Sequence, residues 1–246
     1  MIYDLPWQIT EFENLLASSF YYPEIKNVEL FTKALSHRSF IHDHKIDKIN
    51  SNERLEFLGD AVLDLIVSEK LYEQESNLDE GDLSQIRSAL VNEHRLSDLT
   101  IFTGLNKFLL LGKGEEKNGG RDRSKNLSRV FEAIIGAIYL DSNYQKTRDC
   151  LLKVYQAYED SNEVNLFSKE VLEDFDSKSE LQEKIMKHFK LTPEYRTKNM
   201  GEGVFQTTLW VGDKSLGLAL GKSKKKAEKK LAKELLENPT IFKEYK

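Results

Sequence analysis

The chain has 246 residues, of which 39% are hydrophobic and 31% are charged, as expected of a soluble protein with one large domain or two smaller ones. No apolar run approaches the ~18 residues of a membrane span, and the N-terminus shows no secretory signal, so we expect no membrane association. The single cysteine, Cys150, cannot form an internal disulfide, which favours a reducing cytoplasm and a buried, unreactive thiol. Residues 176–246 carry a net charge of +6 and residues 1–175 a net charge of −11. The basic C-terminal part favours a polyanionic partner, although random surface charge would give the same pattern.

Residues 1 to about 155 are predicted to be mostly helical. Apolar residues recur at helical spacing in residues 55–66, with Leu65 among them, and again in residues 130–138. A glycine-rich break at residues 113–120 predicts an exposed loop between two helical stretches.

The C-terminal part has a different pattern. Residues 159–175 are acidic and polar and predict a linker that can include a short helical piece. A helical stretch after Ser179 is followed by three extended segments, residues 194–197, 204–211 and 215–220, separated by glycine-containing turns. A last helix is predicted from Ser223, a good N-cap, to about Glu237. We therefore predict an all-α domain (1–158), an acidic linker (159–175) and a small α-β-β-β-α domain (176–240).

Three acidic residues share one face of a predicted helix. Glu53, Glu56 and Asp60 follow one another at i, i+3 and i+7, where like charges repel and destabilise an isolated helix. A divalent cation with oxygen ligands would compensate this repulsion, whereas a solvated acidic face is the plainer interpretation.

The residues around this face carry a motif. Residues 52–60 read NERLEFLGD, and further matches stand in order at residues 34–39 (ALSHRS), 79–84 (DEGDLS), 87–91 (RSALV) and 132–141 (EAIIGAIYLD). These strings resemble the ribonuclease III family, and the resemblance covers residues 30 to about 236. It implies a hydrolase, a metal-dependent endonuclease that cuts double-stranded RNA and leaves 5′-phosphate and 3′-hydroxyl ends.

The resemblance also implies roles for individual carboxylates. Glu56, Asp60 and Glu132 would ligate Mg²⁺, and Asp60 and Glu132 would be the catalytic residues. Glu53 and Glu80 would be supporting carboxylates near the cleavage site. No cofactor other than the metal ion is expected, and His37 is expected to be a structural hydrogen-bonding residue.

One position departs from the family pattern. The family usually has an Asp three residues before the catalytic Glu, and this chain has Arg129 there. On a helix, Arg129 and Glu132 share a face, so a positive charge would stand beside the proposed ion and weaken its binding. Two interpretations stay open: Arg129 points outward or toward RNA phosphate and the enzyme works with fewer carboxylates, or the site is impaired.

The final helix begins with a basic run, residues 222–230, whose plain interpretation is a solvated lysine face. The free N–H groups of a helix start and consecutive lysines suit backbone phosphates. With the α-β-β-β-α order, the segment resembles a double-stranded-RNA-binding domain. By that resemblance, five residues would contact RNA: Gln182, Glu183, Lys222, Lys224 and Lys225. The turn at residues 201–204 lacks the family's usual His, which implies weaker binding by this domain alone.

The resemblance further implies a homodimer, with two sites that each cut one strand of a duplex. Phe57 would be a dimer contact, and packing in the core of its own domain is an equal alternative. Processing of ribosomal and messenger RNA precursors is a family expectation. The competing hypothesis is a double-stranded-RNA-binding protein that does not cleave, which Arg129 favours and the intact Glu56, Asp60 and Glu132 set opposes. A helical metal-binding protein unrelated to RNA is a weaker alternative, because the C-terminal domain argues against it.

Overall fold

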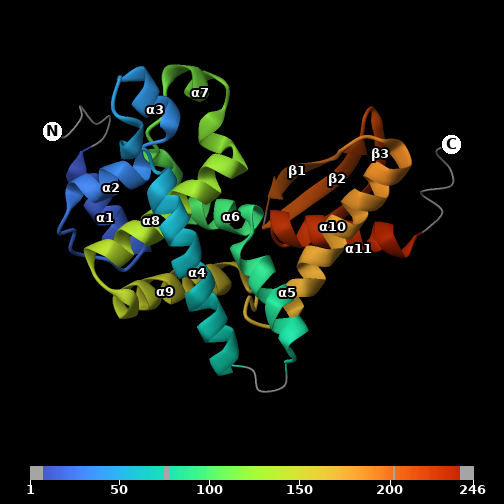
Figure 1. Ribbon diagram of the computed structural model, residues 1–246. Helices are drawn as coiled ribbons and strands as arrows, with labels where there is room; N and C mark the ends of the chain where they lie inside the picture. Colours follow the sequence, from blue (N-terminus) through green and yellow to red (C-terminus); the bar gives the residue numbers. More distant parts are fainter. Residues whose placement is uncertain (1–7, 75–77, 202, 239–246) are drawn as a thin grey trace. The chain divides into compact units, whose positions relative to one another are not determined.

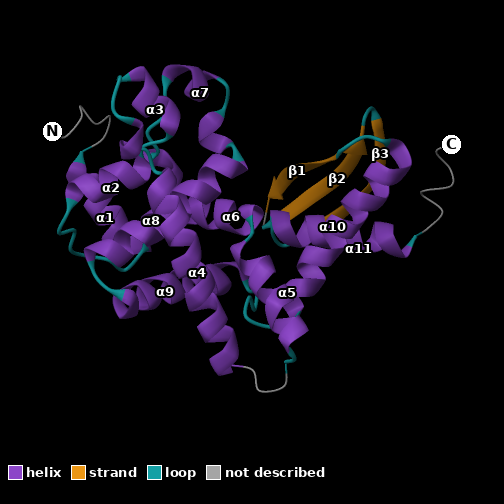
Figure 2. Cartoon of the chain, viewed as in Figure 1, coloured by secondary structure: helices purple, strands orange, loops and turns teal. Residues whose placement is uncertain are grey.

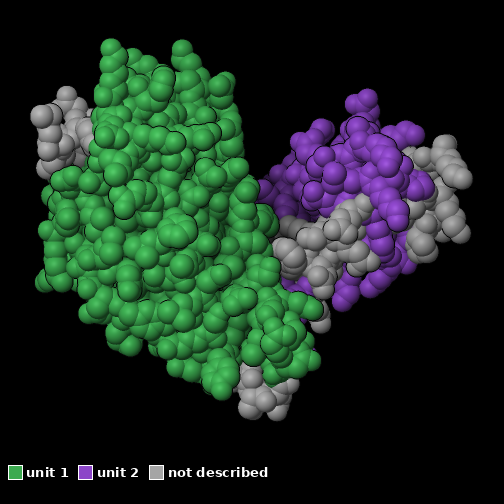
Figure 3. Space-filling model, in the orientation of Figure 1, with its two compact units in different colours: residues 1–167 green, residues 168–246 purple. Residues whose placement is uncertain are grey.

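The computed structural model describes residues 8–74, 78–201 and 203–238 (Figure 1). The chain forms two compact units, Met1–Phe167 and Ser168–Lys246, which Figure 3 shows in different colours. Within the described ranges, no helix has both the length and the apolar character needed to cross a membrane.

The first unit is helical, as predicted (Figure 2). Its α-helices and short 3₁₀ helices (η) are α1 (Ile9–Ser19), α2 (Val28–Leu35), α3 (Arg38–Asp43), η1 (Lys48–Asn50), α4 (Glu53–Gln74), α5 (Glu80–Val91), α6 (Glu93–Thr103), η2 (Leu105–Phe108), α7 (Lys113–Lys117), η3 (Gly120–Asp122), α8 (Ser124–Asp141) and α9 (Tyr144–Asn162).

The centre of this unit is the packing of α4 against α8. Both helices bury apolar side chains at helical spacing, including Val62 and Ile66 on α4 and Ile134 and Ile138 on α8. Leu65, expected on the buried face, is instead 57% exposed because it lies on the side of α4 turned away from that core. The long buried seam fixes where the polar residues of the two helices meet.

The glycine-rich segment at residues 113–120 is not the open loop that we expected. It contains the five-residue helix α7, and its acidic residues are held by arginines that follow. Arg121 forms an ion pair with Glu116, with 2.6 Å between Nη2 and Oε2, and Arg123 pairs with Glu115. These two ion pairs compensate the poor helix propensity of glycine.

The stretch from residue 159 to residue 175, predicted as a linker, is largely helical and contains the boundary between the two units. The end of α9 and the start of α10 (Glu170–Phe189) both lie in it. Between them, Leu166 and Phe167 are buried, and the Phe167 ring packs edge-on against Tyr155 at 5.3 Å. Two neighbouring apolar residues do not produce a helical repeat in the sequence, so the hydrophobic pattern predicted a linker.

The second unit has the predicted α-β-β-β-α order. Strands β1 (Pro193–Gly201), β2 (Val204–Val211) and β3 (Lys214–Gly221) form an antiparallel sheet in sequence order, followed by α11 (Lys224–Glu237). Helices α10 and α11 supply Leu181, Ile185, Leu231 and Leu235 to a core shared with the sheet. Ser223 caps α11 as predicted, because its hydroxyl accepts a hydrogen bond from Lys226 N.

Candidate active site

Two glycines let α4 and α8 touch backbone to backbone. A Cβ atom on Gly59 would lie 1.8 Å from the carbonyl oxygen of Glu132, and one on Gly136 would lie 2.5 Å from the carbonyl oxygen of Leu55. Real Cβ atoms do not approach oxygen so closely, so only glycine fits at this crossing. Because Gly59 stands next to Asp60 on α4, the crossing brings the acidic face of α4 beside Glu132 on α8.

The carboxylates at this crossing interact strongly. Burial, followed by the negative charges of Asp60 and Glu56, raises the pKa of Glu132 to about 8. Burial also raises the pKa of Glu56, although the positive charge of Arg129 opposes the shift. The structure therefore brings together the three residues that the sequence assigned to one site, and it places them where negative charge is costly.

Arg129 points into this cluster. Its Nε lies 3.2 Å from Oε1 of Glu56, and both side chains are about three-quarters buried. The expectation that Arg129 could turn away is therefore wrong for this structure, because the carboxylate of Glu56 attracts the guanidinium. The other oxygen of Glu56, Oε2, is buried without a hydrogen-bond partner among the described residues.

The remaining predicted carboxylates lie farther from the centre. Glu53 is close enough to raise the pKa of Glu56. Glu80 lies exposed in the first turn of α5, accepts a hydrogen bond from Ser84 at 3.0 Å, and has no described interaction with the other three. Asp64 was not predicted, yet its charge contributes to the raised pKa of Glu132. Its spacing of i+4 from Asp60 is the sequence signal that could have found it.

These residues partly fit a divalent ion. Carboxylate oxygens are the ligands that Mg²⁺ prefers, and the unpartnered Oε2 of Glu56 offers one more lone pair to a cation. However, no three His, Cys, Asp or Glu side chains in the described part of the chain already converge as a ligand group. The ion pair with Arg129 holds Glu56, so an ion would have to compete with the guanidinium for this carboxylate.

The raised pKa of Glu132 predicts a pH-dependent stability in metal-free protein. Between its ordinary pKa of 4.5 and about 8, Glu132 keeps a proton in the folded state and loses it in the unfolded state. Stability contributed by this group therefore falls as pH rises through this window and levels off above it. The Glu132→Gln variant cannot ionise, so its melting temperature relative to the wild type should rise between pH 5 and pH 8 in chelator. A pH-independent difference between the two melting curves would show that Glu132 is not buried among negative charges.

The RNA-contact residues predicted in the second unit are only partly described. Three of them are exposed: Gln182 on α10, Lys222 between β3 and α11, and Lys224 at the start of α11. Lys224 Nζ lies 4.0 Å from Oε1 of the buried Glu228. The side chains of Glu183 and Lys225 lie outside the described part of the structure.

Phe57 lies on the outside of its unit. Its side chain is 81% exposed, so the alternative of packing within its own core is wrong. Tyr72, also 81% exposed, and Leu65 continue an apolar stripe along one side of α4. We call Phe57, Leu65 and Tyr72 the α4 stripe.

Comparisons with known proteins agree with the two units. The family described as Ribonuclease-III-like matches residues 27–158, and the family described as double-stranded RNA binding motif matches residues 177–238. A ribonuclease 3 from Dehalococcoides mccartyi is 36% identical over 93% of this chain and 94% of its own length. A ribonuclease 3 from Borreliella afzelii is 38% identical over 92% of this chain and 89% of its own length.

Solved structures support the same assignment. The nuclease domain of ribonuclease III from Campylobacter jejuni is 41% identical, with a TM-score of 0.54, over 59% of this chain and 94% of that one. A second structure of that domain, 42% identical with a TM-score of 0.52 over 57% of this chain and 93% of that one, is described as showing flexibility in a region involved in dimer formation. Both family descriptions match, and the curated relatives align over nearly the whole chain. The signature carboxylates also meet at the α4–α8 crossing. This chain therefore belongs to the ribonuclease III family of endoribonucleases.

Proposed function

We propose that this chain hydrolyses phosphodiester bonds of double-stranded RNA at the α4–α8 crossing with the help of Mg²⁺. The observation that carries the proposal is the close approach at Gly59 and Gly136, which places Asp60 and Glu56 beside Glu132 and raises the pKa of Glu132 to about 8. Buried acidic groups that repel one another destabilise a fold, and such groups with strongly shifted pKa values are typical of functional sites. Binding of a cation removes that cost.

Glu56, Asp60 and Glu132 would hold the ion, and Asp60 and Glu132 would be the catalytic residues. A bound divalent ion would supply an activated water and stabilise charge on the leaving oxygen. The family resemblance implies products with 5′-phosphate and 3′-hydroxyl ends. Glu53, one turn before Glu56, would act as a supporting carboxylate. Glu80 would act as a supporting carboxylate by contacting the bound RNA, because no described interaction links its side chain to Glu56, Asp60 or Glu132.

The second unit would bind the duplex. Its exposed lysines at the start of α11 would hold backbone phosphates, where the helix N-terminus adds free N–H groups. The first helix, with Gln182 and Glu183, would contact 2′-hydroxyls in a minor groove. We further propose ribosomal and messenger RNA precursors in the cytoplasm as natural substrates, on the strength of the family resemblance.

An assay with long duplex RNA tests the function. The wild type should cut the RNA into short duplexes in Mg²⁺, and it should shift the RNA in a gel without cutting it in chelator. A shift without cutting at every Mg²⁺ concentration would support a binding protein, and neither cutting nor binding would contradict both functions.

The chain would act as a homodimer through the α4 stripe, which leaves three large apolar side chains exposed on one helix. We expect Phe57→Asp to weaken the dimer by about 3 kcal/mol, or about a hundredfold in Kd, because an aromatic contact is replaced by a charge. Analytical ultracentrifugation without RNA would measure the change. The matched control is Met186→Asp on α10, which is 45% exposed and should leave the dimer intact. An unchanged dimer in Phe57→Asp would show that another surface mediates assembly.

A second function has one observation in its favour. Nε of Arg129 lies 3.2 Å from Oε1 of Glu56. The guanidinium thereby neutralises part of the negative charge that would bind a metal ion. A site in which an arginine takes the place of a cation favours a protein that binds duplex RNA without cutting it. The intact carboxylates make the working enzyme the better supported proposal.

The Arg129→Asp variant separates the two functions. Replacing the cation with a carboxylate should lower the Mg²⁺ concentration for half-maximal cleavage by about tenfold or more, because it removes a competing charge and adds an oxygen ligand. Thermal stabilisation by Mg²⁺ should increase in parallel, and the neutral Arg129→Gln should lie between the two. An inactive wild type and an active Arg129→Asp would support the binding protein, whereas identical Mg²⁺ curves would show that Arg129 does not oppose the ion.

A further inference from the structure

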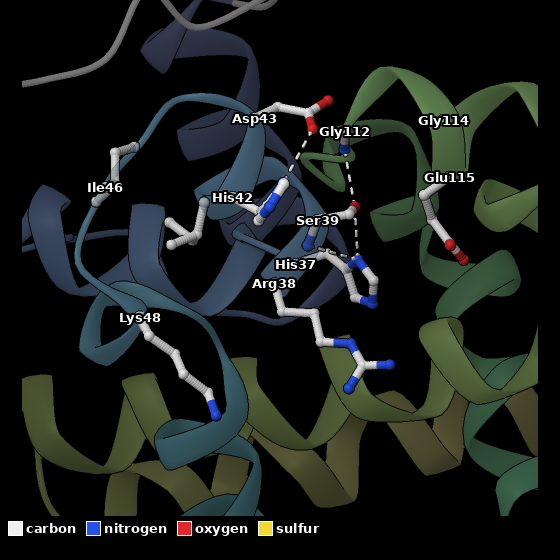
Figure 4. A pocket seen from close by; sticks show the side chains of 11 residues that line it. His37, Arg38, Ser39, His42, Asp43, Ile46, Lys48, Gly112, Gly114 and Glu115 are labelled. Atoms are coloured by element: carbon white, nitrogen blue, oxygen red, sulfur yellow. Dashed lines mark hydrogen bonds and ion pairs between the residues drawn. The ribbon is translucent and has the colours of Figure 1, made fainter.

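A pocket of about 590 Å³ lies in the first unit, apart from the acidic cluster. It is formed by His37 and α3, the residues that follow α3 up to Lys48, and Gly112 with the first residues of α7 (Figure 4). We call it the α3 pocket. None of the residues assigned above to metal binding or catalysis lines it.

Gly112 lets the start of α7 pack closely against α3 on one side of this pocket. A Cβ atom at this position would lie 2.6 Å from the carbonyl oxygen of Ser39, so the start of α7 can approach α3 only with glycine at residue 112. The close approach lets Gly112 N donate to Ser39 Oγ at 2.9 Å, and Ser39 Oγ lies 2.8 Å from Nδ1 of His37 (Figure 4). The imidazole of His37 is thereby oriented by two elements that are far apart in the sequence.

These hydrogen bonds determine which ring nitrogen of His37 carries the proton. Nδ1 accepts from the backbone N–H of Ser39 at 3.2 Å, and the Ser39 hydroxyl, which already accepts from Gly112, donates to Nδ1. Burial lowers the pKa of His37, which favours the neutral ring. A neutral imidazole whose Nδ1 accepts must carry its hydrogen on Nε2. Nε2–H is therefore a donor, and no described residue accepts from it.

The charges of the pocket favour an anionic ligand. Arg38 and Lys48 line it, and neither forms an ion pair with any residue in the described ranges. The two acidic residues of the lining are already engaged: Asp43 accepts from Lys113 N at 2.8 Å, and Glu115 pairs with Arg123. The positive charges of Arg38 and Lys48 and the Nε2–H group of His37 are therefore available to bind a ligand.

The pocket adjoins the two helices that carry the acidic cluster. Asn52 N, directly before α4, donates to Ser36 O at 2.8 Å, directly before His37. Glu115 accepts from Asn126 Nδ2 at 2.9 Å, one turn before Arg129 on α8. The charges of Glu53 and Arg129 also act on the His37 ring. An RNA strand at the cluster therefore has the α3 pocket beside it.

We propose that the α3 pocket binds one ribose–phosphate unit of the RNA strand next to the scissile bond. His37 Nε2–H donates to the 2′-hydroxyl of that unit, Arg38 and Lys48 hold its phosphate, and the apolar side chains of Ile41 and Ile46 pack against the sugar. A 2′-hydroxyl distinguishes RNA from DNA, so this contact would select RNA beside the cleavage site. The inference rests on the proposed cleavage of RNA and adds to it where the strand is held.

Single 2′-deoxy substitutions around one defined cleavage site test the proposal. In the wild type, we expect one position to slow cleavage about tenfold, as for the loss of one hydrogen bond, while its neighbours have little effect. In His37→Gln the same substitution should cause no further loss, because the donor is no longer oriented. A uniform response along the strand, or an equal tenfold loss in His37→Gln, would overturn the proposal.

A second variant keeps the test valid if His37→Gln folds poorly. Lys48 is exposed, and Lys48→Gln should lower kcat/KM about tenfold, with no additional loss when the adjacent phosphate is replaced by a neutral methylphosphonate. Lys146→Gln, an exposed lysine on α9, is the matched control. Additive losses in Lys48→Gln, or dissociation of the dimer by this variant, would overturn the assignment to RNA. A wild type that cuts none of the RNAs would instead contradict the proposed function itself, and the pocket assignment with it.

Discussion

Replacing Asp60 with Asn or Glu132 with Gln is expected to slow cleavage of duplex RNA by about a thousandfold, which corresponds to about 4 kcal/mol of lost transition-state stabilisation. Asp60→Asn removes a negative charge that helps to raise the pKa of Glu132, and Glu132→Gln removes a carboxyl group that would ionise when a cation binds. The amide keeps the size of the side chain, so the loss reports the charge and not the packing. Single-turnover cleavage at saturating protein would measure the chemical step without a contribution from RNA affinity.

Binding of RNA should survive both substitutions, because neither Asp60 nor Glu132 is among the proposed phosphate contacts. A gel shift in chelator should give a Kd within about twofold of the wild type. Asp149→Asn, an exposed carboxylate on α9, is the control and should cleave normally. If Asp60→Asn or Glu132→Gln retained more than about a tenth of the wild-type rate, the cluster would not be the catalytic centre.

The second large effect is expected from Gly59→Ala, which should destabilise the first unit by about 3 kcal/mol and lower its melting temperature by about 10 °C. The new methyl group would stand 1.8 Å from the carbonyl oxygen of Glu132, so α4 and α8 would have to separate. The same separation moves Asp60 away from Glu132, and cleavage should fall even at temperatures where the variant remains folded. Calorimetry and a cleavage assay at 20 °C would measure the two consequences separately.

Gly114→Ala provides the control for the melting measurement. No atom lies within 4 Å of the place where its Cβ would stand, and it lies inside the short helix α7. Alanine should therefore leave stability unchanged or raise it slightly, because glycine is the poorer helix former. If Gly59→Ala melted like Gly114→Ala, the two helices would not cross as closely as the structure places them.

Much of the fold could be predicted because it depends on local periodicity. The helical first unit, the three strands and the cap at Ser223 follow from apolar spacing, turn residues and a side-chain cap. The helical character of residues 159–175 could not, since it depends on a few contacts such as Phe167 with Tyr155. Helix α7 was missed for a similar reason: ion pairs with Arg121 and Arg123 stabilise it.

The candidate site divides in the same way. The carboxylates of α4 share a helical face, so their proximity could be predicted, whereas their meeting with Glu132 depended on the family resemblance. The ion pair between Arg129 and Glu56 is a contact between two helices, and no spacing within one helix predicts it. The α3 pocket needs Gly112 and His37 to meet across more than seventy residues, which only tertiary structure shows.

Titration of the metal-free protein with Mg²⁺, followed by calorimetry, tests most directly whether the acidic side chains of α4 and α8 share one cation. The wild type should bind with a dissociation constant that rises as pH falls below about 8, because protons compete for Glu132, and Arg129→Asp should bind more tightly. Asp60→Asn and Glu132→Gln should each abolish the heat of binding. Equal affinity for Mg²⁺ in the wild type and in both amide variants would contradict the account.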